Sequence, residues 1–380
     1  MRARTPLRAI ALVVVAAAAL SGCSDDEAVP LAEVDSIDDR IAAMPGVEDA
    51  TATANAVTGR IDLEIALAAD IARPDLEAVG REAAAFGDSI TPEGTFPGSA
   101  EIRLGDSIFA YFGAGGAEQV NAQLGYWLDL ARVGFERVAM RDLADYGAPD
   151  EQLGDADAGD AAAAGDAGAT APEEAAPRYV LLDLPDDADP AGAEGIFARA
   201  RALADPGAAA GEWEITGFGD QARLQLAQPG IAGSEQVRQL GEFGEAVSAL
   251  DEHATIRLRS DAAATPPLDV EMTLFDDSLE HATSDDVERR LIEGPMWPAL
   301  DGIIAELDHV GADYDFDLLA NPLADGGNFE LEVSVRDCLF RGDPDWPQAS
   351  DELGAGWLAH RASADPISVA TGACAVADEG

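Results

Sequence analysis

The sequence predicts an α+β fold made of tandem α/β-sandwich units with mainly antiparallel sheets. Short segments with an apolar residue at every second position alternate with segments whose apolar residues recur every three or four positions. Turn-forming residues separate these segments, for example at 55–59 and 217–220. Apolar residues make up 47% of the 380 residues, enough for sizeable cores. We therefore expect sheets that carry helices on one face.

A first α+β domain is expected over residues 36–146. Ser36 and Asp39 form a capping-box-like start, and the apolar residues that follow predict a helix over 36–44 that ends at Pro45-Gly46. The remaining predicted elements are strands at 47–54, 60–67 and 133–140, a strand or hairpin at 99–112, and helices after Pro74 and over 120–131.

Residues 147–177 differ in composition from the rest of the chain. They are mainly Ala, Gly, Asp, Glu and Pro, with eight acids, no base and no aromatic residue. Such a segment cannot bury enough apolar surface to order itself. The composition predicts a disordered acidic linker between domains.

Beyond this linker the predicted elements follow the order βαββαβ, the ferredoxin-like order. The segments are a strand at 178–184, a helix at 190–203, a hairpin of 212–216 and 221–227, a helix from Ser234, and a strand at 255–259. A roughly similar order recurs as a strand at 270–275, helices at 285–292 and 298–309, strands at 312–319 and 328–335, a helix near 350–361 and a strand near 366–370. The predicted organisation is a signal peptide at 1–22, a tether at 23–35, domains at 36–146, 178–260 and 261–380, and the linker at 147–177.

The N-terminus has the three parts of a secretory signal peptide. Arg2, Arg4 and Arg8 precede an apolar run over 9–20, which is too short to span a bilayer. The small residues Ser21 and Gly22 follow it.

The segment Leu20-Ser21-Gly22-Cys23 resembles the lipobox of bacterial lipoprotein precursors. This resemblance covers residues 1–23 and implies acylation of the Cys23 thiol and cleavage between Gly22 and Cys23. It also implies attachment to the extracytoplasmic face of the cell membrane, where two or more acyl chains anchor a protein stably.

The charge of the chain is strongly negative. It has 73 acids against 23 bases, a formal charge of −50, and every base is Arg. Such a surface repels nucleic acid and anionic lipids, so we expect neither as a partner. It is compatible with a solvated surface adapted to salt, with cationic partners or with diffuse divalent ions.

The cysteine count predicts a disulfide. If Cys23 carries lipid, only Cys338 and Cys374 remain, and two cysteines of an exported protein are expected to pair. The bridge would tie the C-terminal tail to a strand that ends near Cys338.

The segment Phe86-Gly87-Asp88-Ser89-Ile90-Thr91 resembles the Gly-Asp-Ser block of the GDSL/SGNH ester hydrolases. The resemblance implies Ser89 as the nucleophile. The chain lacks the Gly-x-Asn-Asp and Asp-x-x-His blocks of that family, which supply the oxyanion donor and the base. A helix end and turn is the alternative interpretation.

Asp313, Asp315 and Asp317 follow the spacing that begins an EF-hand calcium loop. Leu318 stands where the loop needs Gly, and Ala324 where it needs Glu. We expect instead a strand with the acids outward, and at most weak divalent binding.

Together these features predict a membrane-anchored lipoprotein with a non-catalytic binding or adaptor role in the cell envelope, an envelope protein as partner, and no cofactor. The alternatives are an ester hydrolase that uses Ser89 and a lipoprotein that binds a solute or divalent ion.

Overall fold

The computed structural model describes residues 31–54, 61–90, 99–111, 117–142, 178–205, 211–218, 222–228, 230–248, 254–275, 279, 282–283, 286–310, 313–320, 328–364 and 366–377. The predicted signal peptide at 1–22, the predicted lipidation residue Cys23 and the predicted linker at 147–177 lie outside these residues.

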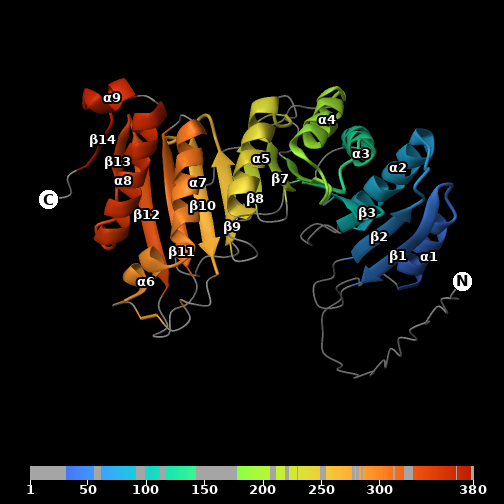
Figure 1. Cartoon of the computed structure of the whole chain (residues 1–380). Coiled ribbons are helices and arrows are strands. Elements are labelled where there is room, and N and C mark those ends of the chain that lie inside the picture. The colour runs from blue at the N-terminus through green and yellow to red at the C-terminus, as the bar shows by residue number, and fades with distance from the viewer. Residues whose placement is uncertain are drawn as a thin grey trace, which may run out of the picture.

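The described strands form one mixed sheet in which each strand lies beside its sequence neighbours (Figure 1). The N-terminal half contains β1 (Val47–Ala54), β2 (Ile61–Leu67), β3 (Ser99–Leu104), β4 (Ser107–Tyr111), β5 (Arg137–Asp142), β6 (Arg178–Asp183) and β7 (Gly211–Gly217). The C-terminal half contains β8 (Ala222–Ala227), β9 (Ala254–Ser260), β10 (Leu268–Leu274), β11 (Tyr314–Ala320), β12 (Phe329–Arg336), β13 (Leu339–Arg341) and β14 (Ala375–Val376).

Antiparallel and parallel pairs alternate from β1 to β12. β1 pairs antiparallel with β2, β2 pairs parallel with β3, and the alternation continues to the antiparallel pair of β11 and β12. Beyond it, β13 is antiparallel to β12 and parallel to β14. The architecture therefore repeats a hairpin followed by a helical crossover.

The helices lie along one side of this sheet (Figure 1). They are α1 (Leu31–Ala42), α2 (Arg73–Ile90), α3 (Ala117–Ala131), α4 (Pro190–Arg201), α5 (Ser234–Ser248), α6 (Val287–Glu293), α7 (Trp297–Val310), α8 (Pro347–Ala364) and α9 (Pro366–Ala370). Helical connections between parallel strands are almost always right-handed. Because every crossover advances in the same direction along the sheet, a common hand places the helices on the same face.

The sequence around α4 shows how these helices are set locally. The Asp189 carboxylate accepts a hydrogen bond of 2.7 Å from the Gly192 amide, and Pro190 occupies the first turn, where no amide is needed. The buried residues of the helix recur at helical spacing. Among them, Phe197 packs edge-on against Phe135 at the start of the preceding hairpin, with ring centroids 5.2 Å apart.

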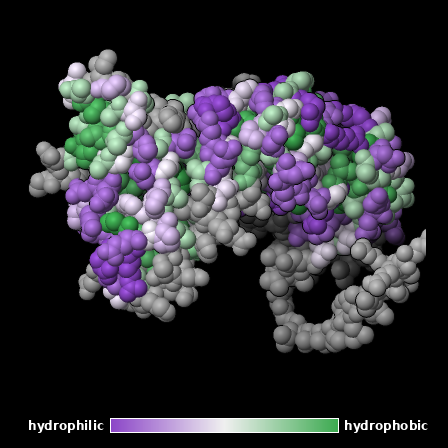
Figure 2. All heavy atoms as spheres, viewed as in Figure 1, coloured by the Kyte–Doolittle hydropathy of each residue, from purple (hydrophilic) through white to green (hydrophobic). Residues whose placement is uncertain are grey.

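The core lies between the sheet and the helices. In β12 the side chains of Phe329, Leu331 and Val333 are buried, whereas Glu330 and Glu332 are exposed. The same alternation runs through β6, β9, β10 and β11. Each fully buried large apolar side chain contributes about 1.5–3 kcal/mol. In the view shared by Figures 1 and 2, hydrophilic side chains cover much of the exposed surface.

The prediction of separate ferredoxin-like units with mainly antiparallel sheets is wrong. The sheet continues from β5 to β6 and from β9 to β10, and parallel pairs are nearly as frequent as antiparallel ones. A ferredoxin-like unit is a split βαβ, whose crossover leaves room for another strand between the two that it joins. Here each crossover returns to the adjacent position, for example from β6 to β7, so no strand is interleaved.

Some element boundaries also differ from the prediction. The first helix begins at Leu31, five residues before the predicted cap at Ser36, and so includes part of the predicted tether. The predicted strand near 366–370 is the helix α9. The chain also turns back at Asp337 and Cys338 to form β13, which the sequence analysis did not predict.

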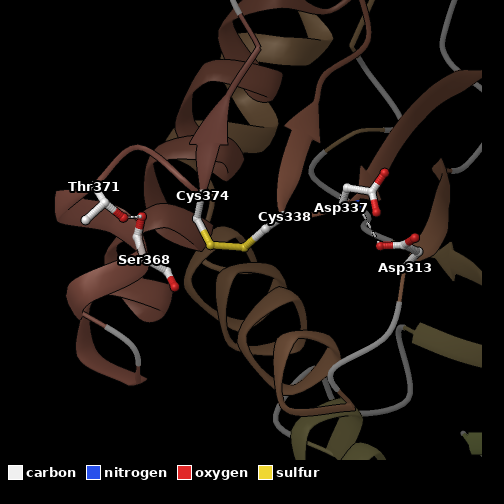
Figure 3. Close-up of a disulfide and its surroundings, with 6 residues drawn as sticks. All are labelled: Asp313, Asp337, Cys338, Ser368, Thr371 and Cys374. Carbon is white, nitrogen blue, oxygen red and sulfur yellow. Dashed lines mark hydrogen bonds between the residues drawn. A yellow bond between two sulfur atoms is a disulfide. The ribbon is translucent and has the colours of Figure 1, made fainter.

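A disulfide closes the C-terminal end of the sheet. Cys338 and Cys374, the predicted pair, are bonded, and their Cα atoms are 4.7 Å apart (Figure 3). Asp337 and Cys338 have φ of 50° and 62°, as in the two-residue hairpin turns that suit the sheet twist. The Asp337 amide donates to the Asp313 carboxylate over 2.8 Å (Figure 3). The bridge thus fixes β13 to β14, which share a backbone hydrogen bond from Ala375 to Cys338.

Replacing Cys374 by Ser is expected to lower the free energy of unfolding by about 3–4 kcal/mol, because the unfolded chain regains the freedom of a long loop. Urea denaturation of the full chain, with and without reductant, measures this. The reductant should destabilise the parent protein and leave the Cys374→Ser variant unchanged. Equal urea midpoints for the two oxidised proteins would contradict the prediction.

Candidate functional site: the open face of the sheet

The side of the sheet opposite the helices is the candidate functional surface, and we call it the open face. Strand residues that alternate with the buried ones point to it, and most are polar or charged. They include Asp62, Glu64, Glu101, Arg103, Arg137, Arg141, Tyr179, Asp183, Glu214, Arg223, Gln225, Arg257, Arg259, Asp269, Glu271, Asp315, Asp317, Glu330, Glu332 and Arg341.

Hydrogen bonds and ion pairs neutralise most charges near the middle of this face. Glu214 is only 6% exposed, and its carboxylate accepts a 2.7 Å hydrogen bond from the Tyr179 hydroxyl. Arg223 and Gln225 also donate to it, at 3.3 and 3.2 Å. Arg141 lies over the Tyr179 ring, 4.6 Å from its centroid. A buried carboxylate needs such partners, so this cluster has a structural role.

Carboxylates accumulate at the C-terminal end of the open face. The register places Glu271 beside Asp317 and Asp317 beside Glu332, on three adjacent strands. We call these three residues the acidic row. Like charges on directly opposed residues of a sheet destabilise it.

The electrostatic effect is clearest at Asp317. Partial burial, followed by repulsion from Asp269 and Glu332, raises the pKa of its carboxyl from 3.8 to about 6. Burial and the neighbouring carboxylates Glu271 and Asp315 also raise the pKa of Asp269. The nearby arginines compensate in part, since Arg336 pairs with Asp315 and Arg257 with Glu271.

A hollow of about 790 Å³ lies over these strands. Its floor includes Asp269, Asp315, Asp317 and Glu332, and its walls come from the connections at 261–267 and 342–344. Arg259 and Arg341 also line it. The volume falls within the range of small-molecule binding sites, but the lining is mainly polar and acidic. We call this the acidic hollow.

The candidate metal residues belong to this region but do not form an EF-hand. Asp315 and Asp317 lie in β11, as the sequence analysis expected, with Tyr314, Phe316 and Leu318 buried. Asp313 precedes the strand and accepts from the Asp337 amide. Within the part of the chain that the structure describes, no group of three His, Cys, Asp or Glu residues is placed to hold a metal ion.

The candidate nucleophile Ser89 lies in the last turn of α2, which ends at Ile90. In the resembled hydrolases the serine block follows a buried strand instead. The repeated Gly105-Asp106-Ser107 forms the turn into β4, with Gly105 at a φ of 58°, and the Ser107 hydroxyl accepts from the Val138 amide over 3.0 Å. This second copy of the tripeptide therefore has a structural role.

No histidine with a described side chain lies near Ser89. His360 is on α8, near the opposite end of the sheet from α2, and contacts Asp301 at 3.3 Å (Figure 1). The one histidine with a described side chain is therefore not on an element beside the helix that contains the candidate nucleophile.

The sequence analysis identified Asp315 and Asp317 but missed Asp269, Glu271 and Glu332 as their neighbours. The alternation of acids with apolar residues in 269–274 and 329–333 is visible in the sequence and indicates that these acids share a face. Their proximity to Asp317 depends on strand order and register, which that alternation does not contain.

Comparisons with known proteins do not assign the chain to a family. No family model, curated protein or solved structure matches the chain significantly. In the part of the chain that is described, no helix is long and apolar enough to cross a membrane.

Replacing Asp317 by Asn is expected to raise the free energy of unfolding at pH 7 by about 1 kcal/mol, after allowance for partial exposure. A carboxyl whose pKa is raised on folding binds more protons in the folded state, so its contribution to stability falls as pH rises from about 4 to about 6. The extra free energy of unfolding of the Asp317→Asn variant over the parent protein should therefore vanish below about pH 4.

Urea denaturation across this pH range tests the difference between variant and parent. Glu330→Gln is the control, because Glu330 is an exposed acid on the same face. A destabilised Asp317→Asn protein at pH 7, or an equal gain from Glu330→Gln, would contradict the account.

Proposed function

We propose that the protein is a lipid-anchored, extracytoplasmic lipoprotein that binds a partner protein of the cell envelope through the open face of its sheet. The observation that carries this proposal is the one-sided burial of the sheet. Helices cover one face, while the other presents polar side chains from successive strands. The role is non-catalytic and adaptor-like.

The anchor is supported by the lipobox-like segment that ends at Cys23. Helix α1 begins at Leu31, eight residues later. Even fully extended, eight residues span only about 26–29 Å. A lipid on Cys23 would therefore hold the N-terminal end of the sheet close to the membrane surface.

The size of the open face supports a macromolecular partner. Strands lie about 4.8 Å apart, so a sheet of fourteen described strands is about 60 Å wide. A stable protein interface needs about 800 Å² on each partner. Most strands have five to eight residues and are about 17–26 Å long, so the open face covers roughly 1,200 Å², which exceeds this area.

Replacing Cys23 by Ala is expected to abolish incorporation of labelled palmitate and to move the protein from the membrane fraction to the soluble fraction. The reason is that the remaining chain offers no acylation site in a lipobox-like context. Fractionation of the producing cells measures the change. A Cys374→Ser variant, which keeps Cys23, should remain in the membrane. Retention of the Cys23→Ala variant in the membrane fraction would contradict the anchor.

Photo-cross-linking groups placed on the two sides of the molecule test the binding face. Groups at Thr255 and Glu330, exposed on the open face, should capture a defined partner in the producing cells. Groups at Glu245 and Glu352, exposed on the helical layer, are the matched controls and should capture much less of it. Equal capture from both sides, or no defined adduct from the open face, would count against the proposed function.

A further inference from the structure

Two large apolar side chains are unusually exposed, and both belong to the acidic end of the open face. Phe275 is 44% and Leu319 is 39% exposed, and they are the exposed large apolar residues among those described. Leu319 lies in β11, two positions beyond Asp317, and Phe275 follows β10, four positions beyond Glu271. We call them the apolar pair.

The register brings Leu319 of the apolar pair next to the acidic row. Leu319 is opposite Thr273 on β10 and Glu330 on β12. Outward residues along one strand are about 6.6 Å apart. Asp315, Asp317 and Leu319 thus pass from acidic to apolar surface over about 13 Å of β11.

The charges of this region are only partly compensated within the chain. Its arginines are outnumbered by its acids, which comprise Asp261, Asp269, Glu271, Asp315, Asp317, Glu330, Glu332 and Asp343. Four arginines, at 257, 259, 336 and 341, lie among them. The residual charge is negative and complements a cationic ligand.

The shape of the region distinguishes a polypeptide from a small cation. The hollow of about 790 Å³ is far larger than an ion requires, and no described set of side chains is arranged to coordinate a metal. An exposed apolar pair beside the carboxylates would gain nothing from a hydrated ion. Contiguous exposed apolar patches that are rimmed by polar side chains mark protein contact sites.

We infer that the acidic hollow, the acidic row and the apolar pair together dock a segment of a partner protein that carries Arg or Lys side chains followed by an apolar residue. This inference rests on the proposed function and specifies the chemistry of the partner. The cationic groups would lie over Asp317 and its neighbours and relieve their mutual repulsion. The apolar residue would cover Leu319 and Phe275.

The test measures binding of a short fluorescent peptide of alternating arginine and leucine to the full chain in detergent. The variant Glu271→Gln/Asp317→Asn/Glu332→Gln removes the acidic row with nearly isosteric side chains. The control Glu245→Gln/Asp351→Asn/Glu352→Gln makes the same charge change among exposed residues of the helical layer. The first variant should weaken binding on the order of tenfold or more, and the control should change it little.

A second variant tests the apolar pair. Leu319→Ser should weaken binding of the arginine–leucine peptide but not of a peptide of alternating arginine and serine. If the acidic-row variant and its control lose the same amount of peptide affinity, the inference is overturned. It is also overturned if spermine or Ca²⁺ displaces the peptide when it is added at the same total concentration of positive charge. Unchanged binding by Leu319→Ser would overturn the apolar contact.

The same variants separate this inference from the proposed function. Cross-linking from Thr255 and Glu330 should fail when the acidic row is neutralised. If those positions still capture the partner from the neutralised variant, the binding face stands and the acidic docking site is wrong. If they capture no partner from the parent protein either, the proposed function itself fails.

Discussion

The structure depends on where each helical crossover returns the chain. Every crossover described between β2 and β11 brings the chain to the position next to the strand that it left, and a hairpin then adds one more strand in the same direction. Right-handed connections that all advance one way place their helices on the same face. The consequence is a sheet that helices cover on one side, while the other side presents mainly polar side chains from successive described strands.

The open face is not uniform, because strand register groups side chains of like charge at one end. Near the middle, arginines lie beside acids, and the carboxylate of Glu214 is enclosed by donors. At the C-terminal end, acids from β10, β11 and β12 are adjacent and repel one another. Such repulsion reduces the stability of the isolated protein. A cationic partner would remove this cost, which gives the arrangement a physical reason within a binding role.

Much of the local structure could be predicted from the sequence. The hairpin of β7 and β8 follows from alternating apolar residues on both sides of a turn, and the disulfide follows from the count of cysteines. The order of the strands could not be predicted in this way, since alternation identifies a strand but not its neighbours. A βαββαβ series permits both an interleaved sheet and the sequential sheet that occurs.

The candidate site was predictable only in part for the same reason. The alternation of acidic and apolar residues in β11 shows that its acids point outward. To predict that Asp317 lies beside Glu332, one must also know how β12 is aligned with β11. The turn at Asp337 and Cys338 was missed because neither residue is a glycine, although both adopt positive φ. The tripeptide around Ser89 suggested a nucleophile, but its backbone belongs to a helix.

The central claim is that the open face is covered by a partner in the cell envelope and the helical layer is not. Carboxylate footprinting compares the protein in intact cells with the purified protein and reads out each modified acid by mass spectrometry. The account predicts that Glu271, Glu330 and Glu332 are modified less in cells, while Glu245 and Asp351 on the helical layer are modified equally in both samples. Equal modification of the open-face acids in the two samples would contradict it.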